Sequence, residues 1–152
     1  MALGLGACGP DPQHEKTVAY LTDLHPVLLE NSLLAEQVLV QAAHVYNKDA
    51  DAPTLIDGWS HQVLPLANHV VVMAEEVQPP EHLASDHAKL VSIWTQRSRA
   101  YREVVEGLHT ADAARFDAAA RETAAITVSE DQWVRAFNDK IGPMQLYVDL
   151  YP

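Results

Sequence analysis

Apolar residues recur at steps of three and four along almost the whole chain, from residue 13 to residue 141. This spacing places them on one face of an α-helix, and it breaks only where residues that begin or end helices occur. The breaks leave four long helical stretches joined by short loops. We therefore predict an all-α protein, an up-and-down antiparallel four-helix bundle. A chain of 152 residues has the size of a single domain.

The first stretch is expected to end in the turn-forming sequence NKDADAP, at residues 47–53. Its apolar spacing predicts that one seam faces the core. The seam residues are Val18, Leu21, His25, Leu28, Ser32, Ala35, Leu39, Ala42 and Tyr46.

The second stretch begins near Thr54 and ends at QPP, and the third ends around GLHT. Thr110 is expected to cap the fourth. Ser129 and Gln132 fit a capping box, so the fourth helix either continues or breaks and restarts near Ser129. The three seams are Trp59, Val63, Leu66, Val70, Met73 and Val77; then Leu83, His87, Leu90, Trp94, Arg97, Tyr101, Val104 and Leu108; then Phe116, Ala120, Trp133, Phe137 and Ile141.

The chain divides into three expected parts: a signal remnant and tether at residues 1–12, the bundle at 13–143 and an extended tail at 144–152. Apolar and polar residues alternate in the tail with a period of two, which is typical of extended backbone. The tail either covers the end of the bundle core as a strap or docks on a partner or a second copy. The candidate partner-binding residues are Leu146, Tyr147, Val148, Leu150 and Tyr151.

The net charge of -11 argues against a nucleic-acid partner and against direct binding to anionic lipid head groups, because no cluster of lysines or arginines offsets it. No apolar run reaches the roughly 20 residues that a membrane-spanning helix needs. The single cysteine, Cys8, excludes an internal disulfide and any all-cysteine metal site.

The sequence contains few of the residue spacings that are typical of catalytic sites. Carboxylate-bridged di-iron bundles need Glu-x-x-His on two helices, and only Glu106 and His109 have that spacing. The local group Asp57, Ser60 and His61 lies on one turn, where adjacent residues point in different directions. His82 and Asp86 share a helix face in a first turn, and we interpret them as a solvated pair. We expect no enzymatic activity.

Four side chains on or next to predicted seams could instead form a ligand or metal pocket: His25, His69, Met73 and His87. Pro26 and Pro65 lie close by in the sequence, and Pro65 should kink its helix or free the carbonyl of His61. Imidazole and thioether ligands together suit copper. The alternative is that buried histidines bond to neighbouring groups such as Ser32, Asn68 or Tyr101.

Arg97 also lies on a seam, where an unpaired charge would be costly. Three outcomes are open for it. The side chain extends to solvent, pairs with a glutamate such as Glu30 or Glu75, or faces a partner.

The N-terminal sequence Leu5, Gly6, Ala7, Cys8 resembles the lipobox of bacterial lipoproteins. The resemblance implies cleavage before Cys8 and a diacylglyceryl group on its sulfur, with GPDPQ as a flexible tether. Seven uncharged residues precede Cys8, fewer than a secretory signal needs, so we interpret them as the end of a signal. The expected location is the bacterial cell envelope, facing the periplasm or the exterior. The alternative is a cytoplasmic protein with an incidental thiol.

These observations lead to one main functional hypothesis and two alternatives. The main one is a non-enzymatic, lipid-anchored accessory or structural subunit that binds another envelope or membrane protein, with self-association left open. No cofactor is required. The first alternative is the metal- or ligand-binding bundle, with copper as the candidate metal. The second is an inhibitor or immunity-type protein, since an acidic helical module suits a basic target.

Overall fold

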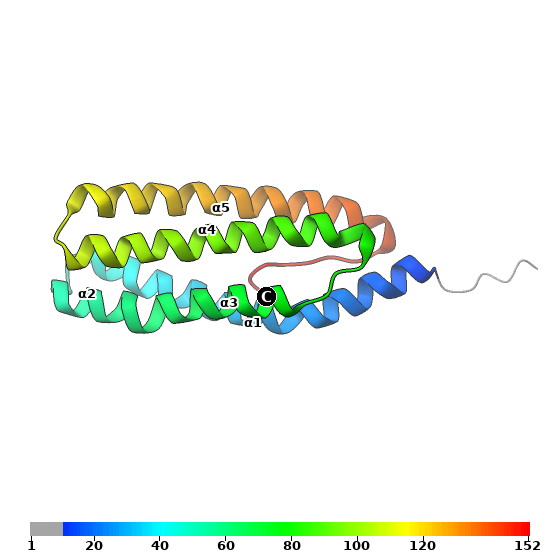
Figure 1. The fold of residues 1–152 in the computed structure, drawn as a ribbon, viewed down its shortest axis with the longest axis horizontal. Helices are drawn as coiled ribbons and strands as arrows, with labels where there is room; N and C mark the ends of the chain where they lie inside the picture. Colours follow the sequence, from blue (N-terminus) through cyan, green and yellow to red (C-terminus); the bar gives the residue numbers. More distant parts are fainter. Residues whose placement is uncertain (1–10) are drawn as a thin grey trace, which may run out of the picture.

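The computed structural model describes residues 11–152 and is helical, with no strand in that range (Figure 1). The all-α prediction is confirmed, and four rods run alternately up and down. The elements in chain order are α1 (Pro12–Asn47), α2 (Ala52–Gly58), the π-helical turn η1 (Trp59–Val63), α3 (Leu64–Glu76), the 3-10 turn η2 (Glu81–Leu83), α4 (Ala84–His109), α5 (Ala113–Ile141) and the 3-10 turn η3 (Gly142–Met144). None of the helices in the described range is long and apolar enough to cross a membrane.

Side-chain caps set the starts of three helices. The carboxylates of Asp11, Asp51 and Asp112 accept hydrogen bonds from backbone N–H groups of the first turns of α1, α2 and α5. The expectation that Thr110 caps the fourth helix is wrong. Its hydroxyl instead donates to the carbonyl oxygen of Glu106 at the end of α4. Ala111, with a φ of 53°, turns the chain before Asp112 begins α5.

The second rod is α2, η1 and α3 in direct succession. The disturbance expected at Pro65 takes the form of the π-helical turn, in which the N–H of Leu64 bonds to the carbonyl oxygen of Trp59. Proline has no N–H to continue the regular α-helical pattern. The fourth rod has no comparable interruption, so the alternative of a break near Ser129 is wrong. The hydroxyl of Ser129 bonds back to the carbonyl oxygen of Ala125 within α5.

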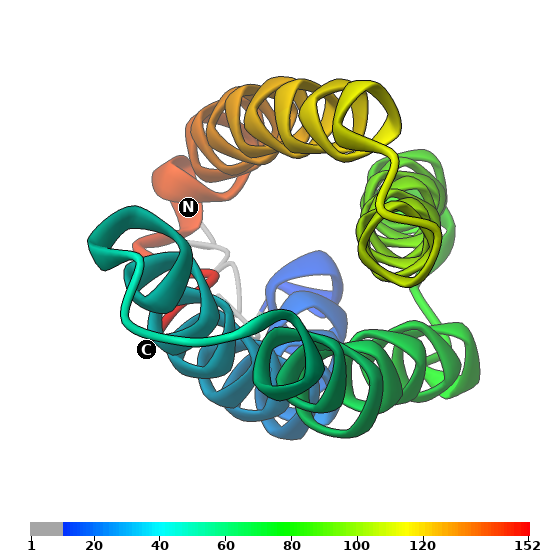
Figure 2. The same cartoon turned by 90° about the vertical axis from the view of Figure 1, so that its left-hand side faces the viewer.

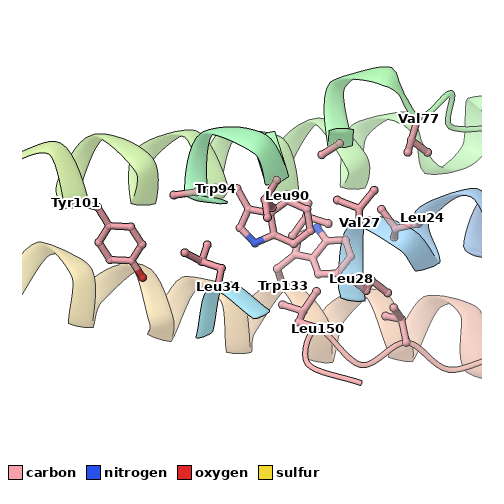
Figure 3. Close-up of a cluster of buried hydrophobic side chains, with 14 of the residues drawn as sticks. Leu24, Val27, Leu28, Leu34, Val77, Leu90, Trp94, Tyr101, Trp133 and Leu150 are labelled. Atoms are coloured by element: carbon pink, nitrogen blue, oxygen red, sulfur yellow. The ribbon is translucent and has the colours of Figure 1, made fainter. Parts of the chain in front are cut away.

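The rods surround a common interior (Figure 2), and the apolar core runs along the inside of the bundle (Figure 3). The predicted seams of α3 and α4 are largely confirmed, since Trp59, Val63, Val70, Leu90 and Trp94 are buried. In α5, Trp133, Phe137 and Ile141 are buried as predicted, but Ala119 takes the place of Ala120.

The phase predicted for α1 is wrong except at Leu28, which is buried as predicted. Its buried residues are Thr17, Tyr20, Leu24, Val27, Leu28, Asn31, Leu34 and Gln41, and most of them precede a predicted seam residue by one position. His25 is exposed and Ser32 is only half-buried. The reason is that α1 carries apolar residues on two adjacent faces, so spacing alone did not decide which face enters the core.

The tail folds back along the bundle as a strap between α1 and α5 (Figure 1). Val148 exchanges two hydrogen bonds with the side-chain amide of Asn138, and Asn31 donates to the carbonyl oxygen of Leu150 at 2.8 Å. Val148 and Leu150 are therefore buried in the protein's own core, not available to a partner in this folded state. Tyr147 is 72% exposed and Tyr151 is 42% exposed, so the outer face of the strap remains accessible.

Candidate binding groove

The predicted seam of α1 lines, from Val18 to Leu39, two hollows at the protein surface that we together call the groove. The groove has two hollows of about 520 and 500 Å³. Val18, Leu21, His25 and Leu28 line the first hollow with the tail. Ser32, Ala35 and Leu39 line the second with parts of α4 and α5.

The end of the tail separates the two hollows. Pro152 borders both of them, and its carbonyl oxygen accepts a hydrogen bond from the Ser32 hydroxyl at 3.3 Å. The sequence was therefore right that these α1 residues share one face. Apart from Leu28, which is buried in the core, that face is directed to the groove and not to the centre of the bundle.

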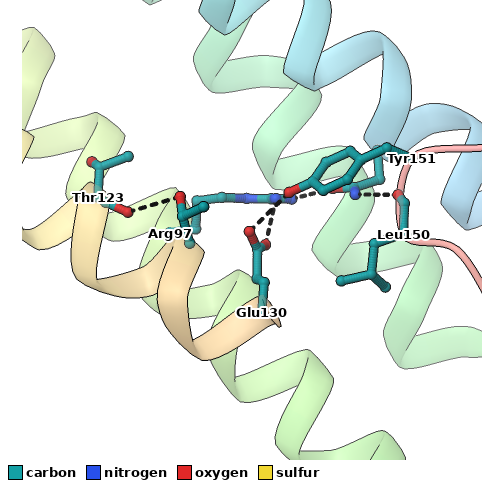
Figure 4. A network of polar contacts seen from close by, with 7 residues as sticks. Arg97, Thr123, Glu130, Leu150 and Tyr151 are labelled. Atoms are coloured by element: carbon teal, nitrogen blue, oxygen red, sulfur yellow. Dashed lines mark hydrogen bonds and ion pairs between the residues drawn. The ribbon is translucent and has the colours of Figure 1, made fainter. Parts of the chain in front are cut away.

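A buried polar network borders the second hollow (Figure 4). Arg97 and Glu130 are 5% and 2% exposed, and the guanidinium Nη1 donates to the Glu130 Oε1 at 2.6 Å. Nη2 donates to the Asn31 Oδ1, and the Tyr151 hydroxyl donates to the Glu130 Oε2 at 2.9 Å. The network joins α1, α4, α5 and the tail through charge-assisted hydrogen bonds.

The Arg97 Nε is buried and has no hydrogen-bond partner among the described protein atoms. The guanidinium carbon lies 5.7 Å from the Trp94 ring, within range of a cation–π contact. Burial raises the pKa of the Tyr101 hydroxyl, and burial with the nearby Glu130 carboxylate raises the pKa of Tyr151. Both tyrosines therefore stay neutral near pH 7 and can donate hydrogen bonds.

The sequence identified Arg97 as unusual but named the wrong partners for it. Glu30 bonds to His69, and Arg97 pairs with Glu130 on a helix that apolar spacing does not connect to it. Glu130 could have been recognised, because it stands at seam spacing between Ile126 and Trp133. A carboxylate in that position needs a buried cation or a pKa shift.

The candidate ligand residues lie in different surroundings. His25 is exposed at the first hollow, His69 is exposed and bonds to the Glu30 carboxylate at 2.9 Å, and Met73 is half-buried. His87 is buried, and its Nδ1 lies 3.0 Å from the Tyr20 hydroxyl. Burial lowers the pKa of His87. The interpretation of a satisfied core histidine therefore holds for His87, with Tyr20 as the partner. In residues 11–152 no group of three or more His, Cys, Asp and Glu side chains is arranged to hold a metal.

The two remaining groups that contain a histidine make local polar contacts. Asp57 and His61 contact each other at 2.9 Å in an exposed position, whereas the Ser60 hydroxyl is buried with no hydrogen-bond partner in residues 11–152, so the three do not form a relay. His82 and Asp86, expected as a pair, instead both receive hydrogen bonds from the Lys140 ammonium, through the His82 carbonyl and the Asp86 carboxylate.

Cys8 and the lipobox-like residues before it lie outside the described residues. Comparison of the chain with protein-family models, curated proteins and solved structures finds no match.

Proposed function

We propose that this chain is a non-enzymatic accessory protein that binds another protein through the groove along α1. The observation that carries the proposal is the apolar seam of α1. Its spacing is that of a buried face, yet Val18 is 39% exposed and Leu39 is 69% exposed. Contiguous apolar surface on a folded domain marks interaction sites more often than isolated apolar residues do.

The groove also has a side chain of the kind that anchors a binding partner. Tyr151 borders its second hollow and is 42% exposed, and tyrosine is enriched among residues that dominate binding energy. Its hydroxyl is held by the Glu130 carboxylate, so binding would cost little ordering of this side chain.

We further propose that the protein is held at a bacterial envelope by a lipid on Cys8. The support is the lipobox-like sequence Leu5, Gly6, Ala7, Cys8. Two or more acyl chains would hold the chain at a membrane without a basic binding surface. The bundle begins three residues after Cys8, at the Asp11 cap of α1, so the groove would stand near the membrane.

Intact-mass analysis of the native protein from a membrane fraction tests the anchor. The expected result is a chain that begins at an acylated Cys8. An unmodified Cys8 in a soluble fraction would rule the anchor out without bearing on the groove.

Site-specific photocrosslinking in native membranes tests the groove. A photoreactive residue at position 39 should give one stoichiometric protein adduct, and the same residue at position 33 should not. Leu39 and Leu33 are matched, since both are exposed leucines of α1 but only Leu39 lines the groove. Adducts of equal yield from both positions, or none from either, would contradict the proposal.

A second candidate function is the binding of a small molecule in the hollow beside Arg97. The observation in its favour is the buried Arg97 Nε, a donor with no partner in the part of the chain that the structure describes, in a residue that lines a hollow of about 500 Å³. Pockets for small ligands have this size and carry a few placed polar groups on apolar walls. The copper alternative stays a separate proposal, tested by titration of the full chain with Cu²⁺ and of a His25→Gln and His87→Gln double variant.

A further inference from the structure

Carboxylates outnumber lysines and arginines among the residues that line the groove. Glu36 is exposed at the second hollow and Asp149 is exposed at the first. Arg97 is the one lysine or arginine among the lining residues of the two described hollows, and its charge is met by the buried Glu130. Each hollow therefore combines mostly apolar lining residues with one exposed carboxylate, on a chain whose net charge is -11.

The length of the groove suits an extended helical partner segment. Its α1 wall reaches from Val18 to Leu39, which is about 32 Å at 1.5 Å per residue. A partner helix of about 20 residues has the same length. Such a helix would insert apolar side chains at steps of three and four into both hollows and would pass over Pro152 between them.

Resting on the proposed protein-binding function, we infer that the partner segment is a cationic amphipathic helix of another protein. Its apolar face lies against Leu21, Leu39 and their neighbours, and its lysines or arginines flank the carboxylates of Glu36 and Asp149. Charge complementarity decides between the possible occupants. A second copy of this chain would bring together two molecules that each have a net charge of -11, and their repulsion opposes association.

The test uses the full chain and two synthetic helical peptides of about 20 residues with the same leucine pattern. One peptide carries lysines at its polar positions and the other carries glutamates. Affinities are measured by fluorescence anisotropy of the labelled peptides. We expect the lysine peptide to bind at least about tenfold more tightly than the glutamate peptide, and its affinity to fall as salt is raised.

Two protein variants separate groove binding from general attraction to an acidic surface. Leu39→Glu and Leu33→Glu add the same charge at exposed positions of α1, so a purely electrostatic complex would be tightened equally by both. We expect Leu39→Glu to weaken binding of the lysine peptide about tenfold, because it removes one apolar contact that the bound helix would bury. Leu33→Glu should leave the affinity within about twofold. Circular dichroism checks that both variants stay folded.

Three results would overturn the inference. They are equal affinity for the two peptides, equal effects of the two variants, and concentration-dependent dimerisation that Leu39→Glu abolishes, which would identify a second copy as the occupant. If the peptides fail to bind while position 39 still crosslinks to a native partner, the cationic helix is wrong and the protein-binding function stands. If both fail, the function itself is wrong.

Discussion

Arg97 and Glu130 are the residues on which the interior of this bundle depends most. Each is almost fully buried, and their charges meet at 2.6 Å. A buried charge without its partner costs far more than an absent pair, because desolvation is no longer offset by attraction. The pair also orders the tail, since the Tyr151 hydroxyl bonds to Glu130 and Arg97 holds the Asn31 amide that bonds to Leu150.

Removal of one member of this pair should be strongly destabilising. We expect Arg97→Met and Glu130→Leu each to lower the free energy of unfolding by about 3–5 kcal/mol. The double variant should lose less than the sum of the two, because neither charge is left unpaired. Urea-induced unfolding measures all three. Losses that simply add would show that the two charges do not stabilise each other.

His87 should make the stability of the fold depend on pH. Burial lowers its pKa, an effect that a backbone contact with Ala74 offsets only in part, so the unfolded chain takes up this proton at a higher pH than the folded one does. Stability is then complete above about pH 6.5, the unfolded value, and falls as the pH drops from there toward the lowered folded pKa. A protonated ring would also lose its ability to accept a hydrogen bond from Tyr20.

Thermal unfolding between about pH 7 and pH 5 checks this contribution. We expect His87→Leu to be less stable than the unsubstituted chain at neutral pH and to lose less further stability on acidification. His44→Gln is the control, because His44 lies at the surface beside Asp49. An unchanged pH profile in His87→Leu would assign the acid sensitivity to other groups.

At the level of elements, α1 and the tail depend on each other. α1 has two adjacent apolar faces, and the bundle buries only one of them. The tail covers part of the other, with its alternating residues divided between an inner face of Val148 and Leu150 and an outer face that includes Tyr147. The side-chain amides of Asn31 and Asn138 form hydrogen bonds with backbone groups of the tail. These bonds take the place of those that a neighbouring β-strand would supply, so the strap needs no such strand.

The two faces of the tail should respond differently to truncation. Leu150→Ala is expected to lower the free energy of unfolding by about 2–4 kcal/mol, since it leaves a cavity at a buried site. Tyr147→Ala should change it by less than about 0.5 kcal/mol, because that side chain is exposed. Chemical unfolding compares the two variants. A similar loss from both would mean that the strap does not hold this register in solution.

At the level of the whole molecule, the excess of carboxylates is the dominant electrostatic feature. The described ion pairs are few and several lie at the surface, such as Arg115 with Glu103 and Lys140 with Asp86. Exposed pairs of this kind contribute little, whereas the unpaired carboxylates repel one another across the compact fold.

Added salt should therefore stabilise the folded chain. Between about 10 and 150 mM NaCl the screening length falls from about 30 to 8 Å. We expect Tm to rise by about 2–4 °C, which corresponds to about 1 kcal/mol for a chain of this size. Differential scanning calorimetry measures the shift, with an uncharged solute at equal osmolarity as the control. A Tm that falls with salt would mean that attraction between charges outweighs their repulsion.

The sequence by itself determined the four rods, most of their ends and the seams of α3 and α4, because capping residues, prolines and apolar spacing act over one or two turns. It also identified Arg97 as a charged residue on a core seam and indicated that the tail was extended. Only the tertiary structure decided which face of α1 enters the core, that Glu130 meets Arg97, and that Val148 and Leu150 return to their own bundle. These features depend on the rotation and axial position of one helix against another, which packing among distant residues selects and local spacing does not specify.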